Sequence, residues 1–196
     1  MAPATPMGIV WDGRLLWVTD SVTDLITPVD PRNGRAIRSF TWAAGNGMGL
    51  AWDGRALWVH DIGTDLIYQV DPRNGRIIRS IAGGTGWAYG LTWDGRTLWV
   101  SDSGTDLITQ VDPQNGRILR SFAWVAGNGM GLVWVGQSLW ICDKGTDLIY
   151  QVASWNGRIL RSFDSPAGNV SGMAWDGRML WVSDYVAKII YQIEVE

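Results

Sequence analysis

The chain has 196 residues but only one cysteine, Cys142, and one histidine, His60. A single cysteine excludes an intrachain disulfide, and without a Cys/His cluster the sequence predicts no zinc or other metal site. Charged residues make up 18% of the chain and the net charge is −3. A basic surface is the usual footprint of nucleic-acid binding, so no nucleic-acid partner is predicted.

Long hydrophobic runs are also missing. No apolar stretch approaches the ~20 residues that a membrane helix needs, so no membrane association is predicted. The opening sequence MAPATPMGIV lacks a charged segment followed by a long apolar run, and we expect no signal peptide in this chain. The compartment therefore stays open between cytoplasmic and secreted.

Two residue types are abundant instead. The chain contains 25 glycines and 14 tryptophans, and 46% of its residues are hydrophobic. Glycine at this level indicates many tight turns, because it adopts backbone conformations that other residues avoid. Tryptophan at this level predicts a large aromatic core.

Five copies of one segment fill the chain. The phrase GLAWDGRALWVHD begins at Gly49, and similar phrases begin at Gly8, Gly90, Gly131 and Gly172, always 41 residues apart. The copies span residues 8–48, 49–89, 90–130, 131–171 and 172–196. We interpret residues 1–196 as a single domain made of these repeats.

Each full copy is predicted to form four short strands. In the second copy these are residues 49–52, 56–60, 66–70 and 76–81, separated by Asp-Gly and Asn-Gly turns. Four antiparallel strands at a period of ~40–45 residues are typical of a β-propeller blade. The predicted fold class is therefore all-β, a five-bladed β-propeller of four-stranded antiparallel blades. A flat stack of hairpins, the alternative, would leave strand edges and aromatic faces in water.

The first strand of the copies and the end of the last copy lead to further predictions. The first strand should be innermost, because it starts with glycine and its third residue is small in every copy, as in Ala51 and Thr92. The last copy stops after its third strand, so the last blade lacks an evident fourth strand. We expect the ring to close without strand exchange, leaving residues 189–195 as an open edge. A monomer is expected, with association through this edge as the competing state.

Ten tryptophans recur at two repeat positions. We interpret them as packing one blade against the next, with a ligand-binding stripe as the alternative. They are Trp11, Trp52, Trp93, Trp134 and Trp175, and Trp17, Trp58, Trp99, Trp140 and Trp181.

Aspartates recur in the turn after the second strand. Turn capping, in which short side chains accept backbone N–H groups, is the favoured interpretation. A calcium-like site is the alternative, but each loop supplies only two carboxylates. The aspartates are Asp20, Asp61, Asp102, Asp143 and Asp184, followed four residues later by Asp24, Asp65, Asp106 and Asp147.

Three other polar groups have an ordinary structural interpretation. Arginines on the outermost strands suit a solvated edge, with an anionic partner as the alternative. They are Arg35, Arg76, Arg117 and Arg158, and Arg38, Arg79, Arg120 and Arg161. His60 and Cys142 occupy a repeat position held elsewhere by serine or threonine, so we expect a polar structural position rather than a catalytic base or nucleophile. No catalytic residue and no cofactor is predicted.

The copies differ most in the loops between blades. These loops should share one rim with the turns after the second strands, and exposed aromatics beside amides there suit stacking on sugar rings. The candidate ligand-binding residues are Trp42, Asn46, Trp87, Tyr89, Trp124, Asn128 and Asn169. The alternative is that the loop tryptophans cap the ends of the blades. On the opposite rim, Trp155 is a lone aromatic in a turn.

The phrases GLxWDGxxLWVxD and YQVDPxNGR resemble those of a bacterial propeller superfamily. That group includes NHL, YVTN, gluconolactonase-like, virginiamycin B lyase-like and glutamine cyclotransferase-like repeats. The resemblance implies a propeller fold but does not specify a chemical activity. A lyase-type site would need histidine, and only His60 is present. A cyclotransferase-type centre would need distinct acidic residues, and the only glutamates are Glu194 and Glu196.

Near-equal blades offer similar surfaces rather than one asymmetric centre. We therefore expect a non-enzymatic propeller that acts as a multivalent, lectin-like binding scaffold, with glycans favoured over protein partners. A repetitive scaffold without a specific ligand is the first alternative. A lyase or cyclotransferase-like enzyme is the second.

Overall fold

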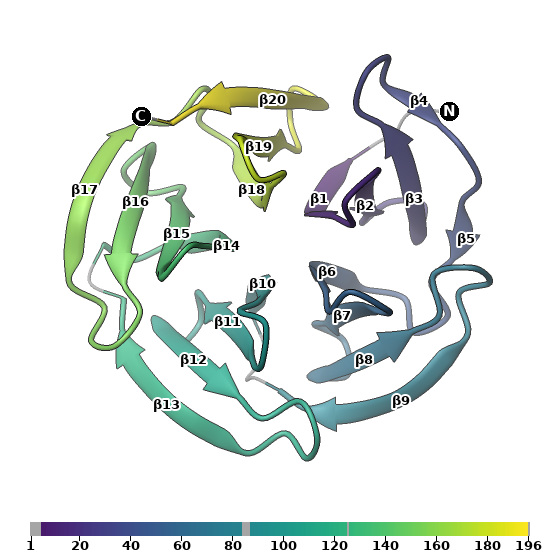
Figure 1. The fold of residues 1–196 in the computed structure, drawn as a ribbon, viewed down its shortest axis with the longest axis horizontal. Helices are drawn as coiled ribbons and strands as arrows, with labels where there is room; N and C mark the ends of the chain where they lie inside the picture. The colour runs from purple at the N-terminus through teal and green to yellow at the C-terminus, as the bar shows by residue number, and fades with distance from the viewer. Residues whose placement is uncertain (1–4, 84–86, 125, 196) are drawn as a thin grey trace.

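Five antiparallel sheets form a closed ring around a central axis (Figure 1). This arrangement is seen in a computed structural model, which describes residues 5–83, 87–124 and 126–195. Each sheet corresponds to one repeat, its first strand beginning two residues before the repeat, and neighbouring strands are consecutive except that β5 pairs with β3. The prediction of an all-β, five-bladed propeller is confirmed.

The strands of the blades are as follows. Blade 1 contains β1 (Pro6–Trp11), β2 (Leu16–Asp20), β3 (Leu25–Asp30), β4 (Arg35–Ala36) and β5 (Phe40–Thr41). Blade 2 contains β6 (Gly47–Trp52), β7 (Leu57–Asp61), β8 (Leu66–Val70) and β9 (Ile77–Ala82). Blade 3 contains β10 (Ala88–Trp93), β11 (Leu98–Asp102), β12 (Leu107–Val111) and β13 (Ile118–Ala123). Blade 4 contains β14 (Gly129–Val135), β15 (Ser138–Asp143), β16 (Leu148–Ala153) and β17 (Ile159–Asp164). Blade 5 contains β18 (Val170–Trp175), β19 (Met179–Asp184) and β20 (Ile189–Glu194).

The first strand of each blade is innermost, as predicted (Figure 1). Its leading glycine lets neighbouring blades approach closely. A Cβ atom on Gly131 would lie 2.9 Å from both the Cys142 Sγ and the Ser171 carbonyl oxygen. No side chain fits at that distance, so glycine is required where five strands converge.

The recurring tryptophans pack one blade on the next, which confirms the packing interpretation. Trp99 of blade 3 stacks on Trp134 of blade 4 with a centroid distance of 6.3 Å and an interplanar angle of 14°. Trp58 of blade 2 shares a hydrophobic cluster with Trp93 of blade 3 in the same way. Each second-strand tryptophan is buried, so a large apolar surface is removed from water at every blade boundary.

Blade 1 departs from the expected four strands because its fourth strand is interrupted. Pairing with β3 occurs at β4 and at β5, and between them the Ile37 N–H donates to the Pro28 carbonyl oxygen at 2.9 Å without forming a strand. Pro28 lies in β3 at this point, where the other blades have glutamine. Proline has no N–H to donate to a neighbouring strand, and this explains the break. This interruption was not predicted from the sequence.

Blade 5 has three strands, and β20 is its edge. The ring closes here without strand exchange. The seam between blades 5 and 1 is held by packing of β18 against β1 and by hydroxyl groups. Ser183 Oγ donates to the Met7 carbonyl oxygen at 2.8 Å, and Ser171 Oγ donates to the same oxygen at 3.1 Å. The predicted open edge is confirmed.

Candidate functional site

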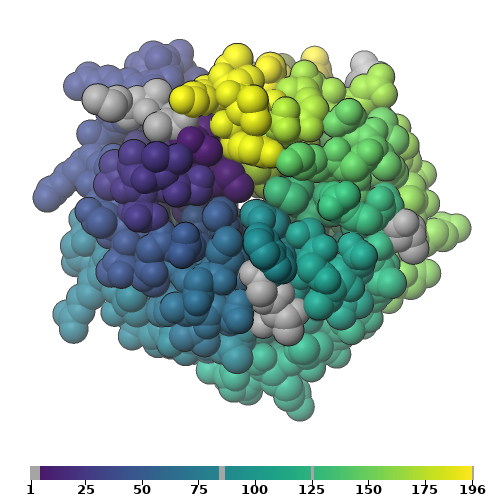
Figure 2. Space-filling model, turned by 180° about the vertical axis from the view of Figure 1, so that it is seen from behind, coloured from purple at the N-terminus to yellow at the C-terminus, as the bar shows by residue number. Residues whose placement is uncertain are grey.

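The loops between blades and the turns after the second strands form one rim, seen from the front in Figure 2. In blade 2, Asp61 organises this rim. Its Oδ1 accepts the Gly63 N–H at 3.1 Å and the Thr64 N–H at 3.0 Å, and its Oδ2 accepts the Asn46 N–H at 3.0 Å. Asp20, Asp102, Asp143 and Asp184 cap their own turns in the same way. The turn-capping interpretation is confirmed.

The second aspartate of each turn has a different role. Asp24, Asp65, Asp106 and Asp147 have φ angles of 53–57°, and Lys188 has 60° in the fifth copy. Aspartate tolerates this left-handed conformation better than most residues. Within the described residues, no three His, Cys, Asp or Glu side chains lie together in a group that suits a metal ion.

Trp42 and Trp124 are not exposed, and the expectation that they present aromatic surface to a ligand is wrong. Both are nearly fully buried. The Trp42 Nε1 donates to Asp61 Oδ2 at 2.8 Å, and the Trp124 Nε1 donates to Asp143 Oδ2 at 2.8 Å. Each indole also packs edge-on against a tyrosine, Tyr68 or Tyr150. They cap the blade ends, which is the alternative that the sequence had left open.

Asn46 and Asn128 are exposed at the ends of these loops. The Asn46 amide nitrogen lies over Gly63, and the Asn128 amide nitrogen lies over Gly145. Their backbone carbonyls accept the Ile62 and Lys144 N–H groups, both at 3.1 Å. The two amides are accessible, but each lies next to a buried tryptophan rather than an exposed one.

Trp87 is the exposed aromatic of this rim, with 56% of its surface accessible. It occupies the repeat position of Asn46, Asn128 and Asn169 and lies over Gly104 in the adjacent turn. Its ring lies 6.4 Å from that of Tyr89, at an interplanar angle of 32°. Tyr89 is half-buried at the start of β10. These two predicted residues therefore form one aromatic surface.

A second group lies on the next two blades. The Lys144 Nζ donates to the Tyr185 hydroxyl at 2.5 Å and lies 5.2 Å from the centre of the Tyr185 ring. The Tyr185 hydroxyl in turn donates to Asn169 Oδ1 at 3.5 Å. Asn169 was predicted, whereas Lys144 and Tyr185 were not. The signal was available, because this turn position holds Ser21, Ile62 and Ser103 in the other blades.

The Lys144–Tyr185 group also interacts electrostatically with Tyr89. Burial raises the pKa of the Tyr89 phenol above its usual value, and the charge of Lys144 acts in the opposite direction. Tyr89 therefore keeps its proton near neutral pH and can donate a hydrogen bond. We call Trp87, Tyr89, Lys144, Asn169 and Tyr185 the rim cluster. Its members come from blades 3, 4 and 5, and the charges of Lys144 and Tyr185 act on the Tyr89 phenol.

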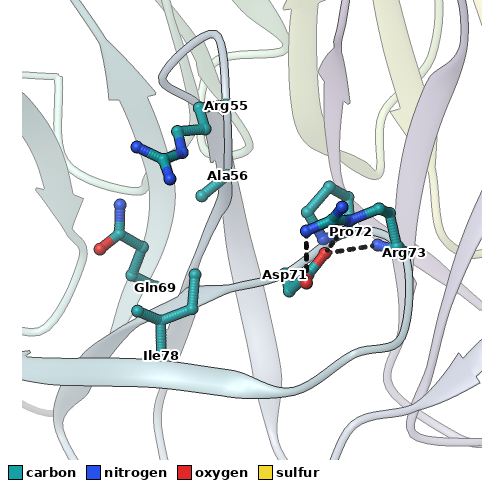
Figure 3. Close-up of a pocket in the computed structure, with 7 residues that line it drawn as sticks. All are labelled: Arg55, Ala56, Gln69, Asp71, Pro72, Arg73 and Ile78. Carbon is teal, nitrogen blue, oxygen red and sulfur yellow. Dashed lines mark hydrogen bonds and ion pairs between the residues drawn. The ribbon is translucent and has the colours of Figure 1, made fainter.

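The opposite rim carries a shallow hollow in blade 2 of about 580 Å³. Figure 3 shows Arg55 and Gln69 on one side of it and the ion pair of Asp71 with Arg73 on the other. A smaller hollow of the same kind lies in blade 1 beside Arg14 and Arg32. Both are shallow and open, so they offer little enclosed surface for a ligand. Trp155 lies on this rim and is 59% exposed.

Two of the outer-strand arginines do more than face solvent. The guanidinium of Arg79 lies 5.1 Å from the centre of the Trp58 ring, and its Nε donates to Gln69 Oε1 at 2.9 Å. Arg161 makes the equivalent contacts with Trp140 and Gln151. These arginines cover the buried tryptophans and contribute cation–π attraction.

His60 and Cys142 lie on the second strands β7 and β15, at the same repeat position, and are fully buried. The Gly131 N–H donates to Cys142 Sγ at 3.1 Å, as the Gly172 N–H does to Ser183 Oγ. Burial raises the pKa of the Cys142 thiol to about 12, so it is no nucleophile near neutral pH. Burial lowers the pKa of His60, although the charge of the Asp61 carboxylate acts in the opposite direction. Within the described chain, neither ring nitrogen of His60 has a hydrogen-bond partner.

The central axis leaves a narrow space of about 100 Å³, lined by residues of all five first strands. Its walls include the five half-buried tryptophans of these strands, from Trp11 to Trp175. So small a space has room for a few water molecules and excludes a larger ligand. The rim cluster is therefore the strongest candidate site.

No helix among residues 5–83, 87–124 and 126–195 is long and apolar enough to cross a membrane. No protein-family model matches the chain, and a search of curated proteins finds no significant sequence match.

Solved structures share the architecture. A glutaminyl cyclase of Myxococcus xanthus is similar over 100% of this chain and 94% of its own, with 14% identity and a TM-score of 0.83. A chain of a nidogen–laminin complex is similar over 98% of this chain and 81% of its own, with 18% identity and a TM-score of 0.70. A virginiamycin B lyase of Staphylococcus aureus, solved with quinupristin, has 17% identity and a TM-score of 0.57 over 93% of this chain and 67% of its own. At such identities the likeness shows the fold alone: this chain is a five-bladed β-propeller similar in architecture to both enzymes and to the nidogen–laminin chain.

Proposed function

We propose that the chain is a binding propeller whose rim cluster recognises a glycan. The observation that supports this is the pairing of an exposed indole, Trp87, with a chain of hydrogen-bonding groups. A sugar ring presents C–H groups on its face and hydroxyls at its edge. The Trp87 and Tyr89 rings suit the face, and Lys144, Asn169 and Tyr185 supply donors and an acceptor for the hydroxyls.

The burial of Trp42 and Trp124 reduces the proposal from several similar binding sites on the ring to one site at the rim cluster. Those two loops keep their indoles inside the protein, so they resemble each other but not the Trp87 loop. The repeats supply a rigid ring, and three blades supply unlike residues for one site on it. Loops on a rigid scaffold are a common place for binding function.

A labelled-protein glycan array is the direct test. We expect saturable signals from a subset of glycans and their loss in Trp87→Ala. Trp155→Ala is the matched control, because Trp155 is exposed to nearly the same extent, 59% against 56%, on the opposite rim. Thermal melting confirms that both variants stay folded. A silent array, or equal signals from both variants, would contradict glycan binding at this cluster and favour a scaffold without a ligand.

Catalysis is the second candidate, supported by the Lys144–Tyr185 pair. A lysine amine in contact with a phenol can pass a proton to or from a bound group. The glutaminyl cyclase of similar fold suggests the reaction to assay, which is cyclisation of an N-terminal glutamine. Activity that disappears in Lys144→Met and Tyr185→Phe would favour an enzyme. Activity that persists in both variants, or none in the wild type, would contradict this candidate.

A further inference from the structure

An apolar groove of about 310 Å³ lies at the seam of the ring, beside the edge strand β20. Leu16, Val29 and Gly34 of blade 1 line one side of it, and Trp181 and Ile190 of blade 5 line the other. Figure 1 shows β20 as the outermost strand of its blade at this point. Among the described residues, no fourth strand of blade 5 covers this groove.

At other blade boundaries a fourth-strand side chain fills the equivalent place. Phe40 of blade 1 packs on Trp17 at a centroid distance of 6.0 Å, and its ring lies against Gly75 of blade 2. Phe122 of blade 3 packs on Trp99 at 6.1 Å and lies against Gly157 of blade 4. Gly34 is the equivalent glycine at the seam. Among the described residues, nothing would lie within 4 Å of a Cβ atom there.

The surface that receives a fourth strand is intact in blade 5. In blades 2 and 4, the third-strand glutamine is paired with an arginine, Gln69 with Arg79 and Gln151 with Arg161. In blade 3, Ile108 is paired with Phe122. β20 has the same residue types in the same order, with Ile190 and Gln192 in these positions. Gln192 is exposed where its counterparts are half-buried.

We propose that this groove binds an extended segment of a partner polypeptide, which adds to β20 as an antiparallel fourth strand. The segment carries arginine, a small residue and phenylalanine in succession. Its arginine pairs with Gln192 and covers Trp181, and its phenylalanine inserts between Trp181 and Gly34. Backbone hydrogen bonds to β20 supply affinity and the two side chains supply specificity. The exposed Glu194 at the end of β20 suits a basic residue of the segment, and the exposed Lys188, which precedes β20 and lines the groove, suits an acidic one.

The fourth strands of blades 2, 3 and 4 are in use and do not fill the groove. β9, β13 and β17 each pair with the third strand of their own blade. Moving one of them to the seam would open a new gap elsewhere in the ring. The same holds for a second copy of the chain, whose own β20 has no arginine or phenylalanine.

Fluorescence anisotropy with a labelled peptide tests the proposal. The probe has the sequence of residues 158–164, Arg-Ile-Leu-Arg-Ser-Phe-Asp, which is a fourth strand of this fold. We expect saturable binding at one peptide per protein. A peptide in which alanine replaces the residue equivalent to Phe163 should bind at least tenfold more weakly, and a scrambled peptide should not bind. Slower amide exchange in β20 should accompany binding.

Two protein variants complete the test. Gln192→Pro removes an N–H that faces the added strand, and the chain already tolerates Pro28 at this position of blade 1. Gly34→Asn places a side chain in the groove, and asparagine tolerates the φ of 68° there. Each should weaken peptide binding at least tenfold in a folded protein. Absence of saturable binding would overturn the proposal. A dimer that Gly34→Asn dissociates would also overturn it, in favour of a second copy as occupant.

Discussion

Blades 2 and 4 have nearly the same packing but differ in the first turn, where Asp53, Arg55 and Ala56 of blade 2 are replaced by Val135, Gln137 and Ser138 in blade 4. In blade 2, Asp53 accepts the Trp58 Nε1 at 2.8 Å and the Gln69 Nε2 at 3.0 Å. In blade 4, Val135 takes this position, and the Gln151 Nε2 donates to Ser138 Oγ at 2.8 Å instead. Within the described residues, the Trp140 Nε1 is buried without a partner.

The shape of the blade survives this difference. Trp140 is as buried as its counterparts, and Arg161 lies 4.9 Å from the centre of its ring, as Arg79 lies 5.1 Å from that of Trp58. Packing of the indole between blades therefore sets the geometry. The hydrogen bond from the indole does not change this geometry. It adds stability, because an unpaired buried N–H carries a free-energy cost.

The largest expected effect is the loss of a packed indole. Trp58→Ala should lower the free energy of unfolding by about 3–5 kcal/mol, since a large cavity opens between blades 2 and 3. Trp140→Ala should cost about 1–2 kcal/mol less, because it also removes an unsatisfied N–H. Urea denaturation of both variants measures the difference. Equal losses would mean that the unpaired indole of blade 4 carries no cost.

The next effect is the loss of the carboxylate. Asp53→Val should cost about 2–3 kcal/mol at neutral pH, because it leaves the buried indole N–H unpaired and removes the cap of the turn. Burial acts to raise the pKa of Asp53, but hydrogen bonds from Ala56, Trp58, Arg55 and Gln69 together outweigh it, and the pKa is lowered.

A lowered pKa in the folded state gives this stabilisation a defined pH range. It is fully present above the unfolded value of about 3.9 and is lost as the pH falls through the folded value. The stabilities of the wild type and Asp53→Val should therefore converge in acid. Arg55→Ala is the control, since its side chain lies outside this network. A difference that stays constant from pH 7 to acid would contradict a role for the charged carboxylate.

The smallest effect is a gain. Val135→Asp should stabilise the protein by about 1 kcal/mol, because it gives the Trp140 N–H an acceptor. The gain should disappear in a Trp140→Phe background, which has no N–H to satisfy. Thermal melting of the four proteins in this cycle measures both quantities. A gain that persists in the Trp140→Phe background would assign the stabilisation to the turn itself.

Much of the fold follows from the repeat. The 41-residue period, the turn glycines and the paired tryptophans predict five blades, the innermost strand and the open last blade, and the structure confirms each. The interruption of the fourth strand in blade 1 was predictable from Pro28 but was overlooked, because a proline among β-branched residues does not disturb the hydrophobic pattern.

The site was less predictable. Trp42 and Trp87 both occur in loops between blades, but only Trp42 reaches an acceptor, Asp61, and becomes buried. The repeat alignment separates the two, since Trp42 aligns with Trp124 and Trp87 aligns with three asparagines. The contact between Lys144 and Tyr185 is different in kind. It joins turns 41 residues apart on neighbouring blades, and a sequence contains no distances between turns.

Closure of the ring without strand exchange also bears on its dynamics. At the seam, blades 5 and 1 are joined by side-chain packing and by serine hydroxyls, so they can separate without breaking a sheet. Opening there exposes one interface, whereas opening within a blade breaks a ladder of backbone hydrogen bonds. We therefore expect the most easily reached fluctuation of the molecule to be a transient opening of the ring between blades 5 and 1. A strand bound at β20 would slow that motion and act as a clasp.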